Sequence, residues 1–172
     1  IMPSCLEKIE LIAKFEDGKI VKGEEKITKY GLTTKKRIKE LKIKPDNVKS
    51  PPEVIKRINQ ANMIIFSPGS LYTSILPNLL IKNIQQAINN SKAVKVFVVN
   101  LLTQPGETDN FTASDHLNEF LKISKLNKIN VAIVNNGKVP QDKIKILKKE
   151  NKKLVFPDIE KVKQLVEKRY LP

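Results

Sequence analysis

A run of small and hydroxyl-bearing residues follows a short apolar stretch near the middle of the chain. Residues 63–65 are typical of a buried strand and residues 79–89 of a helix, so the run lies where a strand passes into a helix. Gly69 lets backbone approach a ligand closely, and phosphate or sugar oxygens could bind the hydroxyls of Ser70, Tyr72, Thr73 and Ser74. Because free N–H groups and the helix dipole attract negative charge there, the pattern predicts an anion site. The alternative is that the serines and threonines only cap the next helix.

A second polar loop follows the strand-like residues 94–99. It supplies amide, hydroxyl and carboxylate groups and leads into a helix that begins near Ser114. Ligands of open α/β sheets bind outside the carboxyl ends of the strands. If the two strands are parallel neighbours, both loops lie at one edge and can share a ligand. The alternative is a pair of ordinary loops with good helix caps.

Three sequence blocks resemble a known family. They are residues 68–80 (PGSLYTSILPNLL), residues 100–108 (NLLTQPGET) with 112–116 (TASDH), and, more weakly, residues 15–24 (FEDGKIVKGE). Together they resemble the gluconeogenesis-factor family (YvcK-type proteins) of the phospholactate-transferase-like (CofD-like) superfamily. Ser67 and Leu102 depart from the usual Gly and Met of that family. The family's glycine-rich nucleotide-binding turn has no counterpart, so the resemblance covers roughly the second half of the family and we expect a fragment.

The resemblance implies a three-layer Rossmann-like α/β fold with a mostly parallel sheet and an added antiparallel hairpin region. It implies a cytoplasmic regulator that binds UDP-sugars such as UDP-N-acetylglucosamine and supports cell shape during gluconeogenic growth, without a firmly implied catalytic activity. An enzyme is the alternative, namely a transferase moving a phospholactyl group from a guanine-type nucleotide donor to a deazaflavin alcohol. Residues 71–73 (LYT) favour the regulator. A third expectation is a fragment that binds no ligand without the glycine-rich half.

The two loops and the following helix start give the predicted ligand-binding residues. They are Gly69, Ser70, Leu71, Tyr72, Thr73, Ser74, Asn78, Asn100, Thr103, Gln104, Gly106, Glu107, Thr108, Asp115 and His116. Family resemblance marks Asp115 and His116, although Ser114 and Asp115 also suit a helix cap and first turn.

Other chemistry has weaker support. Ser70 lacks the Gly-x-Ser-x-Gly turn of a nucleophile elbow, and neighbouring Ser114, Asp115 and His116 point apart on a helix, so a serine hydrolase is disfavoured. Glu107 and Asp109 could hold a magnesium ion between phosphates, or belong to a solvated turn.

Composition narrows the class of protein. The chain has 172 residues, 40% hydrophobic and 29% charged, with a formal net charge of +14 carried mostly by lysine. Low aromatic content (5%) and the lack of tryptophan disfavour nucleic acid as a partner. No apolar run is long enough for a membrane span, and the single cysteine, Cys5, suits a reducing, cytoplasmic setting.

The pattern predicts one domain, with a hairpin and polar excursion over 1–49 and an alternating β/α core over 50–172. Strands are expected at 6–15, 19–26, 63–66, 94–99, 131–134 and 154–156, and helices at 51–59, 79–89, 114–121, 141–150 and 159–168. Ser50 is expected to cap the first of these helices, and residues 30–49 to be irregular. A half sheet would expose an apolar edge, so pairing with another copy is one expectation.

Overall fold

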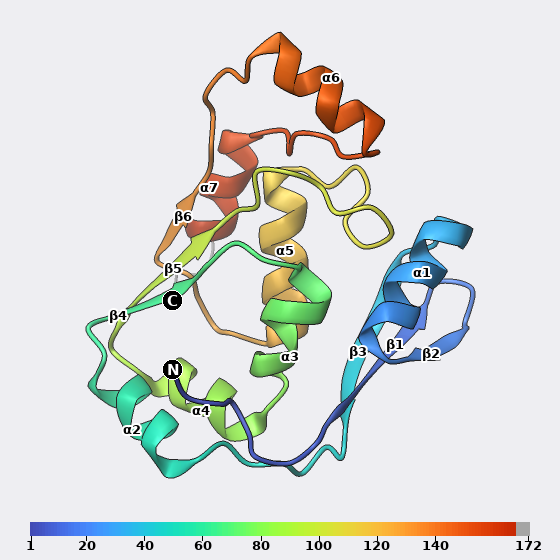
Figure 1. The fold of residues 1–172 in the computed structure, drawn as a ribbon. Helices are drawn as coiled ribbons and strands as arrows, with labels where there is room; N and C mark the ends of the chain where they lie inside the picture. The colour runs from blue at the N-terminus through green and yellow to red at the C-terminus, as the bar shows by residue number, and fades with distance from the viewer. Residues whose placement is uncertain (168–172) are drawn as a thin grey trace.

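The fold contains two separate three-stranded sheets (Figure 1). The computed structural model describes residues 1–167, without the side chains of residues 141, 142, 146, 148 and 167. The antiparallel sheet has the order β2 (Ile20–Lys22), β1 (Glu10–Phe15), β3 (Ile38–Lys44), and α1 (Glu24–Thr34) joins β2 to β3. The parallel sheet has the order β4 (Met63–Phe66), β5 (Val94–Val98), β6 (Val131–Ile133). The predicted mixed α/β class, with a parallel sheet and a separate antiparallel region, is confirmed.

Residues 10–44, here called the hairpin unit, contain the antiparallel sheet and α1, and the sequence of β1 explains how that sheet is packed. Leu11, Ala13 and Phe15 alternate with more exposed residues and are buried, as expected for a strand with one covered face. The turn between β1 and β2 contains Gly18 with φ 83°, a left-handed conformation that suits glycine.

Two expectations for the hairpin unit are wrong. The strand expected to run to residue 26 ends at Lys22, and the excursion expected to be irregular contains the second half of α1 and all of β3. Gly31 and several threonines are poor helix formers, so the local sequence of α1 does not predict a helix. Ile27 of α1 is fully buried, and this packing supports the helix instead.

Residues 52–167, here called the sheet unit, match the predicted alternation of strands and helices. The helices are α2 (Pro52–Gln60), α3 (Leu76–Leu79), α4 (Lys82–Asn90), α5 (Ala113–Ser124), α6 (Gln141–Lys149) and α7 (Ile159–Glu167). Residue 168 of the last predicted helix lies outside the described residues. The expected strand at 154–156 makes only isolated bridges, to Leu102 and Thr112. Pro51 rather than Ser50 takes the cap position of α2.

Apolar side chains cover both faces of the parallel sheet, but only one face is packed. Phe66 of β4 and Phe97 of β5 contact Phe120 of α5, with ring centroids 4.9 and 4.5 Å apart. By register, the opposite face carries exposed side chains, which lie where the third layer of a Rossmann-like sandwich is found. They are Met63, Ile65, Val94, Val131 and Ile133. No helix within residues 1–167 is long and apolar enough to cross a membrane.

Candidate functional site

The two predicted loops meet at one edge of the parallel sheet. β4 and β5 are parallel neighbours, so both loops leave the sheet at its carboxyl edge, as expected from the sequence. Asn100 joins them, because its side-chain nitrogen donates to the Gly69 carbonyl at 2.7 Å and its side-chain oxygen accepts from the Gly69 N–H at 3.2 Å. The amide of Asn100 therefore fixes the backbone of the first loop at the glycine turn.

The first loop continues into one turn of π-helix, Leu71–Ile75. The Ser70 hydroxyl caps this turn by accepting from the Thr73 N–H at 3.1 Å, so the capping interpretation holds for Ser70. Leu71 and Tyr72 point into the core and are each 1% exposed. The exposed Asn78 side chain donates to the Ser74 carbonyl, also on the surface, at 2.7 Å. Single π turns of this kind are rare in proteins as a whole, but they occur often at functional sites.

The Glu107 carboxylate is the centre of the site. It is 4% exposed and accepts hydrogen bonds from Ser70 Oγ at 2.5 Å, Thr28 Oγ1 at 2.8 Å and Gln104 Nε2 at 3.0 Å, with Thr73 Oγ1 at 3.5 Å. A buried carboxylate is stable only with such donors around it. Two of the hydroxyls predicted to face a ligand, those of Ser70 and Thr73, thus hold this carboxylate, and both predicted loops contribute to it.

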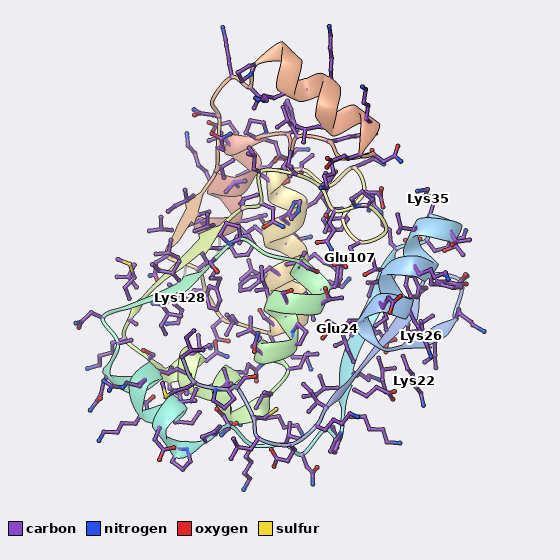
Figure 2. The ribbon with its side chains drawn as sticks, viewed as in Figure 1. Lys22, Glu24, Lys26, Lys35, Glu107 and Lys128 are labelled. Atoms are coloured by element: carbon purple, nitrogen blue, oxygen red, sulfur yellow. The ribbon has the colours of Figure 1, made fainter. Side chains whose placement is uncertain are left out.

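Thr28 comes from α1, so the hairpin unit completes the site. Figure 2 shows Glu107 on the side of the sheet unit that faces α1. Two glycines allow the approach: a Cβ atom at Gly31 would overlap the Gly106 carbonyl oxygen, and one at Gly106 would lie 2.6 Å from the Thr28 carbonyl oxygen. Gly106 also has φ 82°, which disfavours any side chain there.

Hydrogen bonds within the second loop and to a distant segment fix its shape. The fully buried Thr108 hydroxyl accepts from the Gln104 N–H at 2.8 Å, and Asp109 accepts from the Gly106 N–H at 2.6 Å. The buried Thr103 donates its N–H to the Lys153 carbonyl and accepts the Lys153 N–H at its hydroxyl. Thr103 and Thr108 therefore support the loop from inside.

Asp115 belongs to the start of α5. Thr112, not Ser114, is the N-cap, and its backbone N–H donates to Asp115 in a reciprocal capping box. Ser114 instead donates through its hydroxyl and N–H to Asp158 at 2.6 and 2.9 Å. Burial, the largest single effect, raises the pKa of Asp158, but hydrogen bonds from Ser114 and Thr112 act in the opposite direction and the pKa is lowered overall.

His116 is buried behind the loops. It is 1% exposed, its Nδ1 lies 2.9 Å from the Thr112 carbonyl, and its ring meets Phe111 edge-on with centroids 5.4 Å apart. Because a carbonyl only accepts, Nδ1 carries the proton in the neutral ring. The buried Nε2 has no hydrogen-bond partner among the described residues. Burial lowers the pKa of His116, although the Thr112 carbonyl and the Asp115 charge act in the opposite direction.

Tyr72 is as deeply buried as His116, since each is 1% exposed. Burial raises the pKa of Tyr72 far above its ordinary value, and the nearby Glu119 carboxylate adds to the effect. The hydroxyl therefore stays protonated and can act as a hydrogen-bond donor.

A magnesium site at Glu107 and Asp109 stays a prediction. Within residues 1–167, no three acidic, histidine or cysteine side chains gather as a metal site would require. Both oxygens of Glu107 already accept protein hydrogen bonds. The donor set therefore suits a carboxylate held by hydroxyls and an amide better than a bound cation.

Sequence reasoning missed two polar partners of the site, Thr28 and Asp158. Thr28 lies between the strand expected at 19–26 and the irregular segment expected at 30–49, and Asp158 precedes the last helix. Neither has a local motif that marks it, because each acts through a residue far away in the chain, Glu107 or Ser114.

Comparison with known proteins identifies the family. Residues 1–170 match the family described as 2-phospho-L-lactate transferase CofD. The chain belongs to the CofD family. A curated relative from Aquifex aeolicus (strain VF5) is 48% identical over 162 residues, which are 94% of this chain and 49% of the relative. The gluconeogenesis factor of Bacillus subtilis (strain 168) is 37% identical over 165 residues, 96% of this chain and 51% of that protein.

The solved structures agree with this family. The crystal structure of a UPF0052 family member from Bacillus halodurans superposes with a TM-score of 0.90 at 38% identity, over 95% of this chain and 52% of that one. The chain therefore spans about half the length of the CofD-family relatives that it matches.

Proposed function

We propose that this CofD-family chain is the loop-bearing part of a gluconeogenesis factor, a cytoplasmic regulator that binds a UDP-sugar and supports cell shape during gluconeogenic growth. The observation that carries the proposal is the joining of two polar loops at the carboxyl edge of neighbouring parallel strands, where α/β proteins bind nucleotides. The names of the relatives support the regulatory role.

The side chains around Glu107 order the loops for binding rather than for chemistry. Hydroxyls of Ser70 and Thr73 and the amide of Gln104 surround one buried carboxylate, so the loops are already fixed without ligand. The backbone around Gly69 and the exposed Ser74 and Asn78 are the parts of the first loop that a sugar or phosphate would meet. A preformed site costs less ordering free energy on binding.

The description of the family supports a second candidate, a transferase of phosphorus-containing groups. A guanine nucleotide is the donor type expected for that activity. The two candidates therefore differ in the nucleotide that the chain should bind.

Thermal unfolding with UDP-N-acetylglucosamine, and with GDP as the paired ligand, tests the proposal. Ligand at 100 times its Kd stabilises a protein by about 2.7 kcal/mol, which is about 5–10 °C in Tm for a chain of this size. A rise with the UDP-sugar alone supports the regulator, and a rise with GDP alone supports the transferase. No rise with either ligand contradicts binding by this chain.

A further inference from the structure

A basic cavity lies beside the Glu107 site, between the hairpin unit and the sheet unit. It has a volume of about 410 Å³, within the range of small-molecule sites. The end of α1, the second polar loop and the segment before Leu154 line it. The lining residues that carry the argument are Lys35, Lys36, Arg37, Asn110, Asn151 and Lys153.

The charge balance of this cavity favours an anion. The two lining carboxylates are already engaged, because Glu107 accepts from three side chains and Asp109 accepts from the Gly106 N–H. Within the described part of the chain, the cationic groups of Lys35, Lys36, Arg37 and Lys153 form no ion pair. Four cationic side chains and two carboxylates line the cavity, so its lining carries a net positive charge, which favours an anion.

Two of the cations are held in place by neutral groups. Lys153 Nζ donates to the Asn110 side chain at 2.8 Å, and the Arg37 guanidinium lies 5.4 Å from the centroid of the Phe111 ring. Both contacts reduce the side-chain freedom that a ligand would otherwise have to restrict.

The backbone around the cavity is unusual. Lys35, Asn110 and Asn151 have φ values of 56°, 61° and 54°, and Lys125, outside the cavity, is the other non-glycine residue with positive φ in the described chain. Such strained conformations are enriched at binding sites. The N–H of Lys35, the C-cap of α1, donates to the Gly31 carbonyl, so it is used within the fold and an anion here would be held by the side chains.

We infer that this cavity binds the diphosphate group of a ligand, with Arg37 and Lys153 as the fixed cations and Lys35 and Lys36 as mobile ones. The inference deepens the proposed function, since the diphosphate of a nucleotide sugar is such a group, and it rests on that proposal for the ligand class. None of the four cations belongs to the residues predicted from the sequence, so the cavity adds a subsite to the two loops.

Calorimetric titration of inorganic pyrophosphate into this chain at an ionic strength of about 0.15 M tests the subsite. We expect the double variant Arg37→Gln, Lys153→Gln to bind pyrophosphate at least about tenfold more weakly, because the loss of a single charge-assisted hydrogen bond already costs about tenfold. The matched control is Lys49→Gln, Lys56→Gln, which removes the same charge from exposed positions near α2, far from the tip of α1 in Figure 1. The control should keep its affinity within about twofold, since distant exposed charges are screened.

Two results would overturn the inference: no pyrophosphate binding by the unmodified chain, or equal losses in the double variant and the control. If the double variant fails to fold, Lys35→Asn with Lys36→Gln replaces it, because asparagine tolerates the left-handed backbone. The same variants titrated with UDP-N-acetylglucosamine separate the two proposals. Pyrophosphate binding without sugar-nucleotide binding contradicts only the proposed function, whereas sugar-nucleotide binding that ignores Arg37 and Lys153 contradicts only the subsite.

Discussion

The Thr28 hydroxyl donates a 2.8 Å hydrogen bond to the Glu107 carboxylate, 79 residues further along the chain. This contact joins the hairpin unit to the loops of the parallel sheet at a buried charge. Because Ser70 donates to the other oxygen of the same carboxylate, one side chain connects three segments that are far apart in the sequence. The predictions below test this arrangement and the groups around it.

Gly31→Ala is expected to destabilise the protein, although the same change in an exposed helix interior usually stabilises it by about 1 kcal/mol. The added methyl group would overlap the Gly106 carbonyl oxygen. Overpacking of this kind costs about 1–3 kcal/mol, which denaturant unfolding can measure. Gly69→Ala is the control, because its nearest neighbour would lie at 3.7 Å, an ordinary contact. A higher Tm for Gly31→Ala would contradict the close packing.

Glu107→Gln should lower the free energy of unfolding by about 1–3 kcal/mol, because charge-assisted hydrogen bonds become neutral ones and one acceptor becomes a donor. Urea unfolding measures the loss. Asp109→Asn removes a neighbouring negative charge but keeps an oxygen to accept the Gly106 N–H, so it should cost much less. Equal losses in the two variants would show that Glu107 is not the centre of the network.

Stability should fall as the pH decreases below about 6.5, because of His116. Burial lowers the folded-state pKa of His116 below its unfolded value, so between the two values the unfolded chain binds more protons and stability rises with pH. The contribution of His116 to stability is complete above its pKa in the unfolded chain, and it is lost as the pH falls toward its pKa in the folded protein. Urea unfolding between pH 5 and pH 7.5 measures this slope.

His116→Asn should remove the slope, because His116 is the only histidine in the sequence and an amide can still donate to the Thr112 carbonyl. Lower overall stability of the variant is expected from the smaller side chain and does not affect the test. An unchanged slope in the variant, or a flat profile in the unmodified chain, would contradict burial of a neutral imidazole.

Asn100→Asp should weaken binding of UDP-N-acetylglucosamine if the Gly69 turn contacts the ligand. The carboxylate still accepts the Gly69 N–H but faces the Gly69 carbonyl without a donor, so the turn should shift at a cost of about 1–3 kcal/mol. Calorimetry on the unmodified chain, on this variant and on Asn78→Ala, which removes an exposed amide that the ligand would meet, compares the two positions. Equal affinity for all three proteins would place the ligand away from this turn.

The sequence predicts the sheet unit better than the hairpin unit for a physical reason. β4 and β5 are short apolar runs, and α5 begins with a capping box, so both signals are local. α1 contains Gly31, which lowers its helix propensity but is needed for the approach to Gly106. At Gly31 the low helix propensity of glycine conflicts with the close packing that only glycine permits. A pattern in the sequence reveals the propensity but not the packing.

The residues of the candidate site could likewise be predicted from the sequence only in part. Ser70, Gln104 and Glu107 are predicted because they follow strands in polar loops, whereas the partner Thr28 and the cations Lys35, Lys36 and Arg37 lie in a lysine-rich segment without a motif. Leu71 and Tyr72 follow the family pattern but are buried in the core, so their side chains support the loop. Whether the remaining residues contact a ligand stays a prediction.

The docking of α1 has a consequence for the order in which the structure opens. The strands of the hairpin unit pair over short distances in the sequence. The hydrogen bond from Thr28 to Glu107 instead closes a loop of 79 residues, so forming it costs more conformational entropy. Local opening that separates α1 from the second loop would therefore need less free energy than global unfolding. Hydrogen exchange at the backbone amides of Glu107 and Thr108, which donate to Gln104, should then report undocking of α1 before the sheets melt.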